Sequence, residues 1–361
     1  MSRIPSIEEF AGLLIVKEAS RNRENEVPSQ TSVVTLPNDC SDVGQRHTSK
    51  SPTSHVKIAN VTGDVEVSVV TVCFNPLEAG RKEVFQKNLD SVQAQENVRL
   101  EHIIVDGASS DGTLEWLKGY NNTRYDIRIL SLSDDGIFDA MNRGIALSRG
   151  KYIIFLNSDD YFHNPSGMAH SIEKIEHFGC AFSFASIRFA GSPLLRRPQQ
   201  APQRRLHRFL ISFPFSHQSM LTLRDLLLKL DGFDTNYRSA ADYDLLLRMI
   251  EEGAKGCFVP HSFTTFSLGG FSTEYHELSI KERILCLQSF FKEFFKTEMT
   301  SREVEQIILH HVFPRKYLGL YKQTHRLIRE RFLGVPRGPF TWVSSWFNYI
   351  KYYVKCLNSS I

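Results

Sequence analysis

The sequence predicts an α/β fold in which helices cover both faces of a mostly parallel central sheet. Two observations carry this prediction. Short apolar runs rich in Val and Ile alternate with helical stretches between residues 67 and 156, and polar residues follow each run where a strand would end. Alternation of this kind builds βαβ units, whose parallel strands are buried on both faces. The composition agrees, because 42% hydrophobic and 23% charged residues are ordinary values for a globular protein.

The expected elements follow in chain order. The run 67–74 has the β-branched, apolar character of a buried strand. Next, in order, come helix 80–95, strand 100–105, helix 111–117, strand 127–132, helix 137–148 and strand 152–156. Beyond Pro165 the pattern is less regular, with strands expected at 181–189 and 257–266, a Pro/Gln/Arg-rich loop at 192–208, and helices at 223–230, at 242–252 and from 279 onward.

Both ends of the chain differ from the central domain predicted at residues 66–275. In residues 1–65, Ser6-Ile7-Glu8-Glu9 fits a capping box, which predicts one helix through Ala19. The composition of residues 20–60 is typical of a linker or poorly ordered arm. Residues 276–361 are expected to form a helical, basic extension, since residues 310–361 carry nine Lys or Arg and one Glu, a formal charge of +8.

Charge and cysteine content exclude several classes of protein. The formal charge of +3, from 43 basic and 40 acidic residues, is too balanced for a surface devoted to nucleic acid. Six widely spaced cysteines without a Cys-x-x-Cys pair indicate neither a disulfide framework nor a zinc module. No secretory signal and no apolar run of about 20 residues is visible. We therefore expect a soluble, cytoplasmic protein.

The first candidate motif is the segment Asp106-Gly107-Ala108-Ser109, which follows strand 100–105. An acidic residue that leaves a buried strand at a Gly/Ser turn can accept hydrogen bonds from a nucleobase or ribose. The alternative is a tight turn with Asp111 as the cap of the next helix. We favour the binding role for Asp106 and the capping role for Asp111.

The second motif is Asn157-Ser158-Asp159-Asp160, directly after strand 152–156. Two adjacent carboxylates repel each other unless a cation or hydrogen-bond donors offset their charge. Mg²⁺ and Mn²⁺ favour such oxygen ligands and can bridge a diphosphate. The alternative is a solvated turn, because Asn, Ser and Asp are turn residues.

The third motif is the segment 239–248, in which Asp242 lies at an expected helix start and Asp244 follows two residues later. One of these carboxylates is a candidate general base. The alternative is that Asp242 only caps the helix.

Five ordered pieces together resemble the glycosyltransferases of family 2, which have a GT-A fold. They resemble in particular the branch found in bacterial surface polysaccharide synthesis of the colanic-acid type. The matching pieces stand at residues 69–75, 105–113, 135–144, 155–160 and 241–248. The segment 135–144 reads Asp-Gly-Ile-Phe-Asp-Ala-Met-Asn-Arg-Gly, which matches a motif of that branch.

The resemblance implies roles for individual residues. Asp242 would be the catalytic base, and Asp159 would hold a divalent cation, Mg²⁺ or Mn²⁺. The residues implied to bind the nucleotide sugar are Asn75, Asp106 (at the uracil), Ser109, Asp135, Asn142, Asp159, His217 and Gln218. Two departures stand out: Asn157 replaces the first carboxylate of the metal motif, and Met141 replaces a common Arg. For His217, a purely structural role is the alternative.

The implied reaction is an inverting transfer of a hexosyl or N-acetylhexosaminyl group from a nucleotide sugar, which we expect to be UDP-linked. The acceptor would be a hydroxyl of a glycan or of a lipid-linked oligosaccharide. The alternative is a GT-A-like protein that binds a sugar nucleotide or glycan without turnover. Absence of a Gln-x-x-Arg-Trp motif argues against a processive synthase. The basic, aromatic tail is expected to meet an anionic membrane surface from the cytoplasmic side; the alternative is packing on the core.

Overall fold

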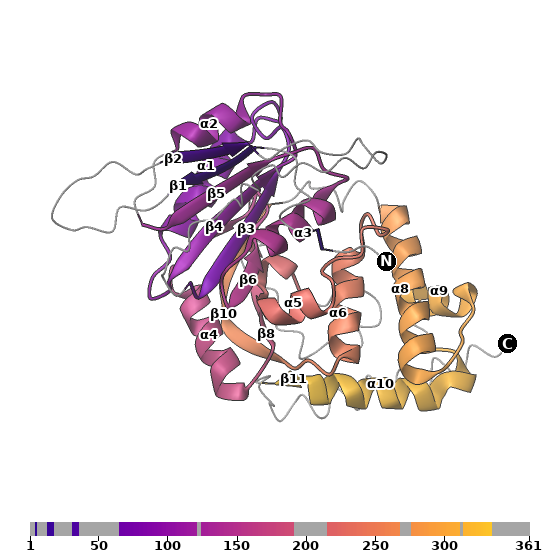
Figure 1. Cartoon of the computed structure of the whole chain (residues 1–361). Coiled ribbons are helices and arrows are strands. Elements are labelled where there is room, and N and C mark those ends of the chain that lie inside the picture. Colours follow the sequence, from indigo (N-terminus) through magenta and orange to yellow (C-terminus); the bar gives the residue numbers. More distant parts are fainter. Residues whose placement is uncertain are drawn as a thin grey trace, which may run out of the picture.

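The computed structural model describes residues 4–5, 13–17, 31–35, 65–120, 124–190, 215–267, 276–310 and 313–333. Within these ranges a mixed sheet runs through the molecule and helices cover both of its faces (Figure 1). The strand order is β11-β10-β8-β9-β6-β3-β4-β5-β1-β2, and β7 pairs with β10. The predicted α/β fold with a largely parallel central sheet is confirmed.

Four parallel strands form the centre of this sheet. In spatial order they are β5 (Asp126–Ser131), β4 (Leu100–Asp106), β3 (Val67–Cys73) and β6 (Tyr152–Phe155). The helices between them are α1 (Lys82–Gln93), α2 (Thr113–Gly119) and α3 (Ile137–Leu147). All seven residues of β3 are buried, as expected for a strand covered on both faces.

Alternate residues of β3 serve two separate hydrophobic cores. Val69 packs in one core with Phe85 of α1 and with residues of α2 and of α4 (Gly167–Phe178). Val70 packs in the other core with residues of α3, α5 (Arg224–Lys229) and α6 (Ala241–Glu251). The period-two alternation of side chains along a strand explains this division.

The second half of the sheet is more irregular. Its strands are β7 (Tyr161–Phe162), β8 (Phe182–Phe189), β9 (Leu221–Leu223), β10 (Gly256–Phe266) and β11 (Phe332–Leu333). The short strand β9 runs antiparallel to both β6 and β8, while β10 runs parallel to β8. The predicted loop 192–208 lies outside the described residues.

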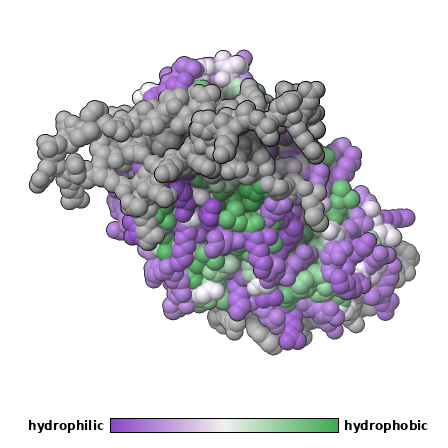
Figure 2. Space-filling view, in the orientation of Figure 1, coloured by the Kyte–Doolittle hydropathy of each residue, from purple (hydrophilic) through white to green (hydrophobic). Residues whose placement is uncertain are grey.

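The C-terminal helices α8 (His276–Phe295), α9 (Ser301–His310) and α10 (Leu318–Arg331) are grouped beside α6 (Figure 1). Leu287 and Phe290 of α8 belong to the same core as Tyr243 of α6. The hydrophobic core therefore continues across the predicted domain boundary at residue 275. In the described ranges, every helix is too short or too polar to cross a membrane. Figure 2 shows hydrophilic residues over much of the visible surface, interrupted by apolar patches.

The helix predicted through Ala19 is wrong for Leu13–Lys17, which form strand β1. This strand pairs antiparallel with β5 and with β2 (Thr31–Thr35), and β2 falls within the segment predicted as a linker. Leu14 and Ile15 are buried in the two different cores. Pairing with an open sheet edge and burial on both faces outweigh the local helix signal. Residues 6–9 of the capping box lie outside the described residues.

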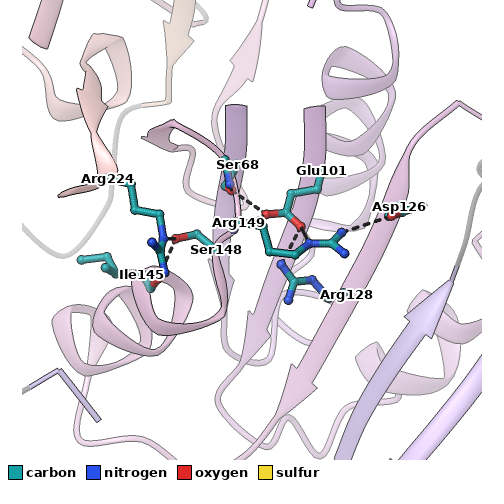
Figure 3. Close-up of polar contacts among 9 residues, drawn as sticks. Ser68, Glu101, Asp126, Arg128, Ile145, Ser148, Arg149 and Arg224 are labelled. Atoms are coloured by element: carbon teal, nitrogen blue, oxygen red, sulfur yellow. Dashed lines mark hydrogen bonds and ion pairs between the residues drawn. The ribbon is translucent and has the colours of Figure 1, made fainter. Parts of the chain in front are cut away.

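A buried ion-pair network holds the amino-terminal end of the central strands (Figure 3). Glu101 of β4 accepts bonds from Arg128 Nη2 at 2.5 Å and from Arg149 Nε at 2.9 Å. Ser68 Oγ donates to the same carboxylate at 2.6 Å. Arg149 also pairs with Asp126 at 3.1 Å. The network thus ties β3, β4, β5 and the turn after α3 together, at the end of the sheet opposite to the predicted site.

Candidate active site

The loops that follow β3 and β4 are bonded to each other at the carboxyl end of the sheet. Asn75 has a φ of 44°, a left-handed conformation that Asn tolerates better than most residues. Its N–H donates to Ser109 Oγ at 2.8 Å, and its Oδ1 accepts the Ser110 N–H at 2.9 Å. The structure therefore brings the predicted residues Asn75 and Ser109 together.

Asp106, at the end of β4, is fully buried. Its Oδ1 accepts the Ser109 hydroxyl at 2.5 Å, and its Oδ2 accepts the Ser131 hydroxyl at 2.7 Å and the Ser109 N–H at 3.1 Å. All of these hydrogen bonds come from the protein itself, and the carboxylate has no exposed surface for the predicted uracil contact. What it does is orient Ser109, whose side chain is only partly buried.

Two residues beside this turn were missed by the sequence analysis. A Cβ placed on Gly107 would lie 2.8 Å from Asp134 Oδ2 and 3.2 Å from Phe74 Cδ2, so both side chains press against the turn. Phe74 is 68% exposed, which is unusual for the last apolar residue of a strand run. Burial raises the pKa of Asp134. The neighbouring Asp135, which was predicted for this place, is exposed.

Asp111 bonds the loop after β3 to the start of α2. Its Oδ2 accepts the N–H groups of Leu77 and Glu78 at 2.7 and 2.9 Å, and its Oδ1 accepts the Thr113 N–H at 3.0 Å. Burial alone would raise the pKa of Asp111, but these bonds and that of the Thr113 hydroxyl lower it. Asp111 thus serves the start of α2, close to its predicted capping role, and also fixes the loop after β3.

Asp159 lies at the end of β6, across β3 from Asp106. Its side chain is 18% exposed, and its Oδ2 is 3.5 Å from Nη1 of Arg81 at the start of α1. Burial raises the pKa of Asp159, and the Arg81 charge partly opposes this. Burial, and then the Asp159 charge, raise the pKa of the fully buried Asp160 well above its ordinary value.

Asp160 links the metal motif to two later segments. Its Oδ1 accepts the Ser267 N–H at 2.8 Å, and the nearby Gln218 side chain lowers the pKa of Asp160. Gln218 is 2% exposed. The structure therefore places Gln218 behind the metal motif, as a support for Asp160.

The oxygen atoms of the metal motif fit a hard divalent cation. Asn157 Oδ1 is buried and has no hydrogen-bond partner among the described residues, and Asp159, two residues later, is a partly exposed carboxylate. In the part of the chain that is described, no group of three or more His, Cys, Asp or Glu residues converges on one point. The chain would therefore share the ion with a ligand, as Mg²⁺ sites built from one or two carboxylates, water and phosphate do.

Asp242 lies in the first turn of α6, and its side chain is 21% exposed. One oxygen, Oδ1, accepts the Tyr243 N–H at 2.7 Å and thus serves the helix start. The other, Oδ2, is 3.4 Å from His217 Nδ1. His217 and Asp242 also border a cavity of about 20 Å³, room for about one water molecule. The contact of Oδ1 fits the predicted role at the helix start, and the position of Oδ2 beside His217 and the cavity fits the role of a base.

Asn142, predicted to bind the nucleotide sugar, and Asp244, the alternative base, both have structural roles. Asn142 is 1% exposed; its side-chain amide donates to Phe233 O and its Oδ1 accepts the Phe233 N–H, both at 2.8 Å. Its predicted contact with the nucleotide sugar is therefore not supported. Asp244 pairs with Arg248 at 2.7 Å, which leaves Asp242 as the candidate base.

The contacts form a continuous line along the carboxyl edge of the sheet. The line runs from the Asn75 loop through Arg81, Asp159, Asp160, Gln218 and His217 to Asp242. Open α/β sheets bind ligands at this edge, and a carboxylate suited to a cation together with a candidate base on the same edge fits a transferase of nucleotide sugars.

Comparison with known proteins agrees with this class. Residues 68–228 match the family model "Glycosyl transferase family 2". An uncharacterized glycosyltransferase of Mycobacterium tuberculosis is 32% identical over 194 residues, which are 52% of this chain and 70% of that protein. The chain belongs to glycosyltransferase family 2. Asp242 lies beyond the matched model, so its role as the base stays a prediction.

Two further similarities help to place the chain. The chondroitin synthase of Pasteurella multocida is 28% identical over 171 residues, covering 46% of this chain and 18% of that much longer protein. Among solved structures, residues 1–349 of TarS from S. aureus in complex with UDP-GlcNAc give a TM-score of 0.53 at 16% identity, covering 68% of this chain and 71% of that one. The latter similarity supports the GT-A fold.

Proposed function

We propose that this protein is an inverting glycosyltransferase that moves a sugar from a UDP-linked donor to a hydroxyl group of a glycan or lipid-linked oligosaccharide in surface polysaccharide synthesis. The observation that carries the proposal is the continuous line of contacts between Asp159 and Asp242. It sets a carboxylate suited to a cation and a candidate base on one edge of the sheet. UDP is preferred because TarS, which has a similar fold, was solved with UDP-GlcNAc.

The nucleotide would lie over the loops after β3 and β4. Phe74 offers an exposed aromatic face on which a base can stack. Ser109 Oγ donates to Asp106 and accepts the Asn75 N–H, so one of its lone pairs is left to accept a bond from the nucleotide; the side chain of Asn75 is fixed beside it. Asp135 is exposed at the edge of this surface and is the candidate contact to the donor sugar.

In the proposed reaction, Asp242 Oδ2 removes the proton from the acceptor hydroxyl while that oxygen attacks the anomeric carbon. The new bond joins this carbon to the acceptor oxygen, and the bond to the diphosphate oxygen breaks. His217 lies beside the base and would hold its carboxylate in place. A divalent cation on Asp159, with Asn157 beside it, would offset the negative charge of the leaving nucleoside diphosphate.

The place of the reaction is also a proposal. We expect a cytoplasmic protein that meets its acceptor at the anionic inner surface of a membrane. The support is the charge of +8 over residues 310–361 together with Trp342, Trp346 and several Tyr residues in the same segment. Basic and aromatic side chains favour the membrane interface. Nucleic acid is not an expected partner.

A panel of nucleotide sugars tests the proposed function. The purified chain is assayed for nucleoside diphosphate release with and without Mn²⁺. We expect release from one or a few UDP-sugars that depends on the cation, including slow hydrolysis when no acceptor is present. Tight binding of a nucleotide sugar without any turnover would instead support the alternative, a binding protein with a GT-A-like fold.

A further inference from the structure

A carboxylate from the C-terminal helices holds the segment that leads into α6. Glu282 of α8 is 6% exposed. Its Oε1 accepts the Arg238 N–H at 2.9 Å, and its Oε2 accepts the N–H groups of Ser239 at 2.7 Å and Ala240 at 2.9 Å. Three consecutive N–H groups thus donate to one buried side chain that lies more than forty residues further along the chain.

Helix α6 has no side-chain cap of its own at this point. Its N-cap residue is Ala240, whose methyl side chain cannot accept a bond from the first turn. A negative charge near a helix N-terminus is stabilising, and Glu282 supplies one from a neighbouring helix. One turn later on α8, Cys286 Sγ lies 4.0 Å from Ala240 O. The backbone before the helix is therefore fixed on both its N–H and its carbonyl side.

The fixed segment ends two residues before Asp242. A carboxylate that removes a proton must stand within hydrogen-bond reach of it, and a misplacement of about 1 Å can cost about 100-fold in rate. Movement of Ala240 would carry the first turn of α6, and with it Asp242 Oδ2 and its 3.4 Å approach to His217.

We infer that Glu282 is a positioning residue for the base Asp242, and that the C-terminal helices are thereby part of the catalytic unit. The inference rests on the proposed function, in which Asp242 removes the proton. Glu282 lies outside the matched family model, which ends at residue 228. The contact lies beside the continuous core in which α8 packs against α6.

The test uses the full chain with Glu282→Gln and Glu282→Asp, and Glu277→Gln as the matched control. Glu277 is an exposed residue of the same helix. A Gln amide has one acceptor oxygen and an NH₂ group that would face the donors, so at least one of the three N–H groups loses its partner. The Asp variant keeps the charge but is shorter by one methylene group.

Turnover is measured per UDP-binding site, with the number of sites taken from calorimetric titration with UDP. We expect kcat of Glu282→Gln to fall by roughly 10-fold to 100-fold, while KM for the donor and Kd for UDP stay within about 2-fold because the nucleotide loops are untouched. Glu282→Asp should recover part of the loss, and Glu277→Gln should equal wild type.

Wild-type kcat per UDP-binding site in every Glu282 variant that folds would overturn the inference, whatever the change in melting temperature. If Glu282→Gln does not fold, Glu282→Asp carries the test by the same criterion. Asp242→Asn is assayed in parallel. Turnover retained by Asp242→Asn refutes the proposed base, whereas an inactive Asp242→Asn beside fully active Glu282 variants refutes only the positioning role.

Discussion

Replacing Glu101 by Gln should destabilise the protein without changing its affinity for the donor. Glu101 is fully buried and is bonded to Arg128, Arg149 and Ser68 (Figure 3). The Gln variant leaves the 3% exposed Arg128 side chain without its anion. Breaking a buried pair from one side costs about 3–5 kcal/mol. Because Arg149 is 27% exposed and keeps Asp126, we expect the lower value, about 3 kcal/mol.

That loss corresponds to a fall in melting temperature of about 4 °C, because unfolding gains about 2.1 cal/mol/K of entropy per residue and the chain has 361 residues. Urea unfolding followed by circular dichroism gives the free energy of unfolding directly. The control is Glu176→Gln, which breaks an ion pair between Lys151 and Glu176 whose side chains are both 58% exposed and should cost less than about 1 kcal/mol.

The pH dependence of stability gives a second check on Glu101. Burial alone would raise the pKa of Glu101, but Arg128 and Arg149 outweigh it and lower the pKa. The carboxylate therefore stabilises the fold above its unfolded pKa, about 4.3, and this contribution is lost as the pH falls through the lower folded pKa. The difference between wild type and Glu101→Gln should shrink in the same range.

The unchanged donor affinity follows from distance. Glu101 is five residues before Asp106 on β4, which places the two about 16 Å apart along the strand. A free energy of unfolding within about 1 kcal/mol of wild type would refute the reasoning about the buried pair. A large rise in KM for the donor would refute the placement of the site at the opposite end of the sheet.

Three further predictions concern the site and the tail. Asp159→Ala should lose cation-dependent binding of the nucleotide sugar, measured by calorimetry, and EDTA should abolish wild-type turnover; full activity in EDTA would remove the metal role. Phe74→Ala should weaken UDP binding by roughly 1–3 kcal/mol, the usual contribution of base stacking, with kcat little changed; an unchanged Kd for UDP would exclude stacking on Phe74. Replacing Arg337, Lys351 and Lys355 by Gln should reduce co-sedimentation with anionic liposomes, because each basic residue contributes about 1 kcal/mol near such a surface; equal pelleting with anionic and neutral liposomes would remove the membrane role from the tail.

The sequence predicted those parts of the fold that depend on local pattern. The β-branched run of β3 and the helical stretches of α1 and α3 stand where expected, within a few residues. β1 was mistaken for a helix because one of its two pairing partners, β5, is more than 100 residues away in the sequence, and the other, β2, lies in the segment predicted as a linker. A capping box is a local signal, and a strand that completes a distant sheet edge leaves no local trace.

In the candidate site, too, residues marked by a local pattern could be predicted, and those that depend on distant contacts could not. Asp159 and Asp242 could be selected from motifs, because Asp159 follows β6 and Asp242 lies in the first turn of α6, two elements whose sequence patterns are readable. Asn142 could not be excluded, since its partner Phe233 lies 91 residues later. The choice between Asp134 and Asp135 depends on the direction of two neighbouring side chains. Phe74 did carry a signal, an aromatic residue at the polar end of a strand run, but its exposure is visible only in the structure.

The most direct test of the central claim is the turnover of Asp242→Asn with its UDP-sugar donor and acceptor. An amide cannot accept the acceptor proton, and a general base contributes roughly 10²–10⁴-fold to rate. We therefore expect kcat to fall by that factor while Kd for UDP stays near the wild-type value, since Asp242 lies at the other end of the line of contacts from Asn75 and Ser109. Turnover close to wild type would show that Asp242 serves only the start of α6, and would contradict the proposed mechanism.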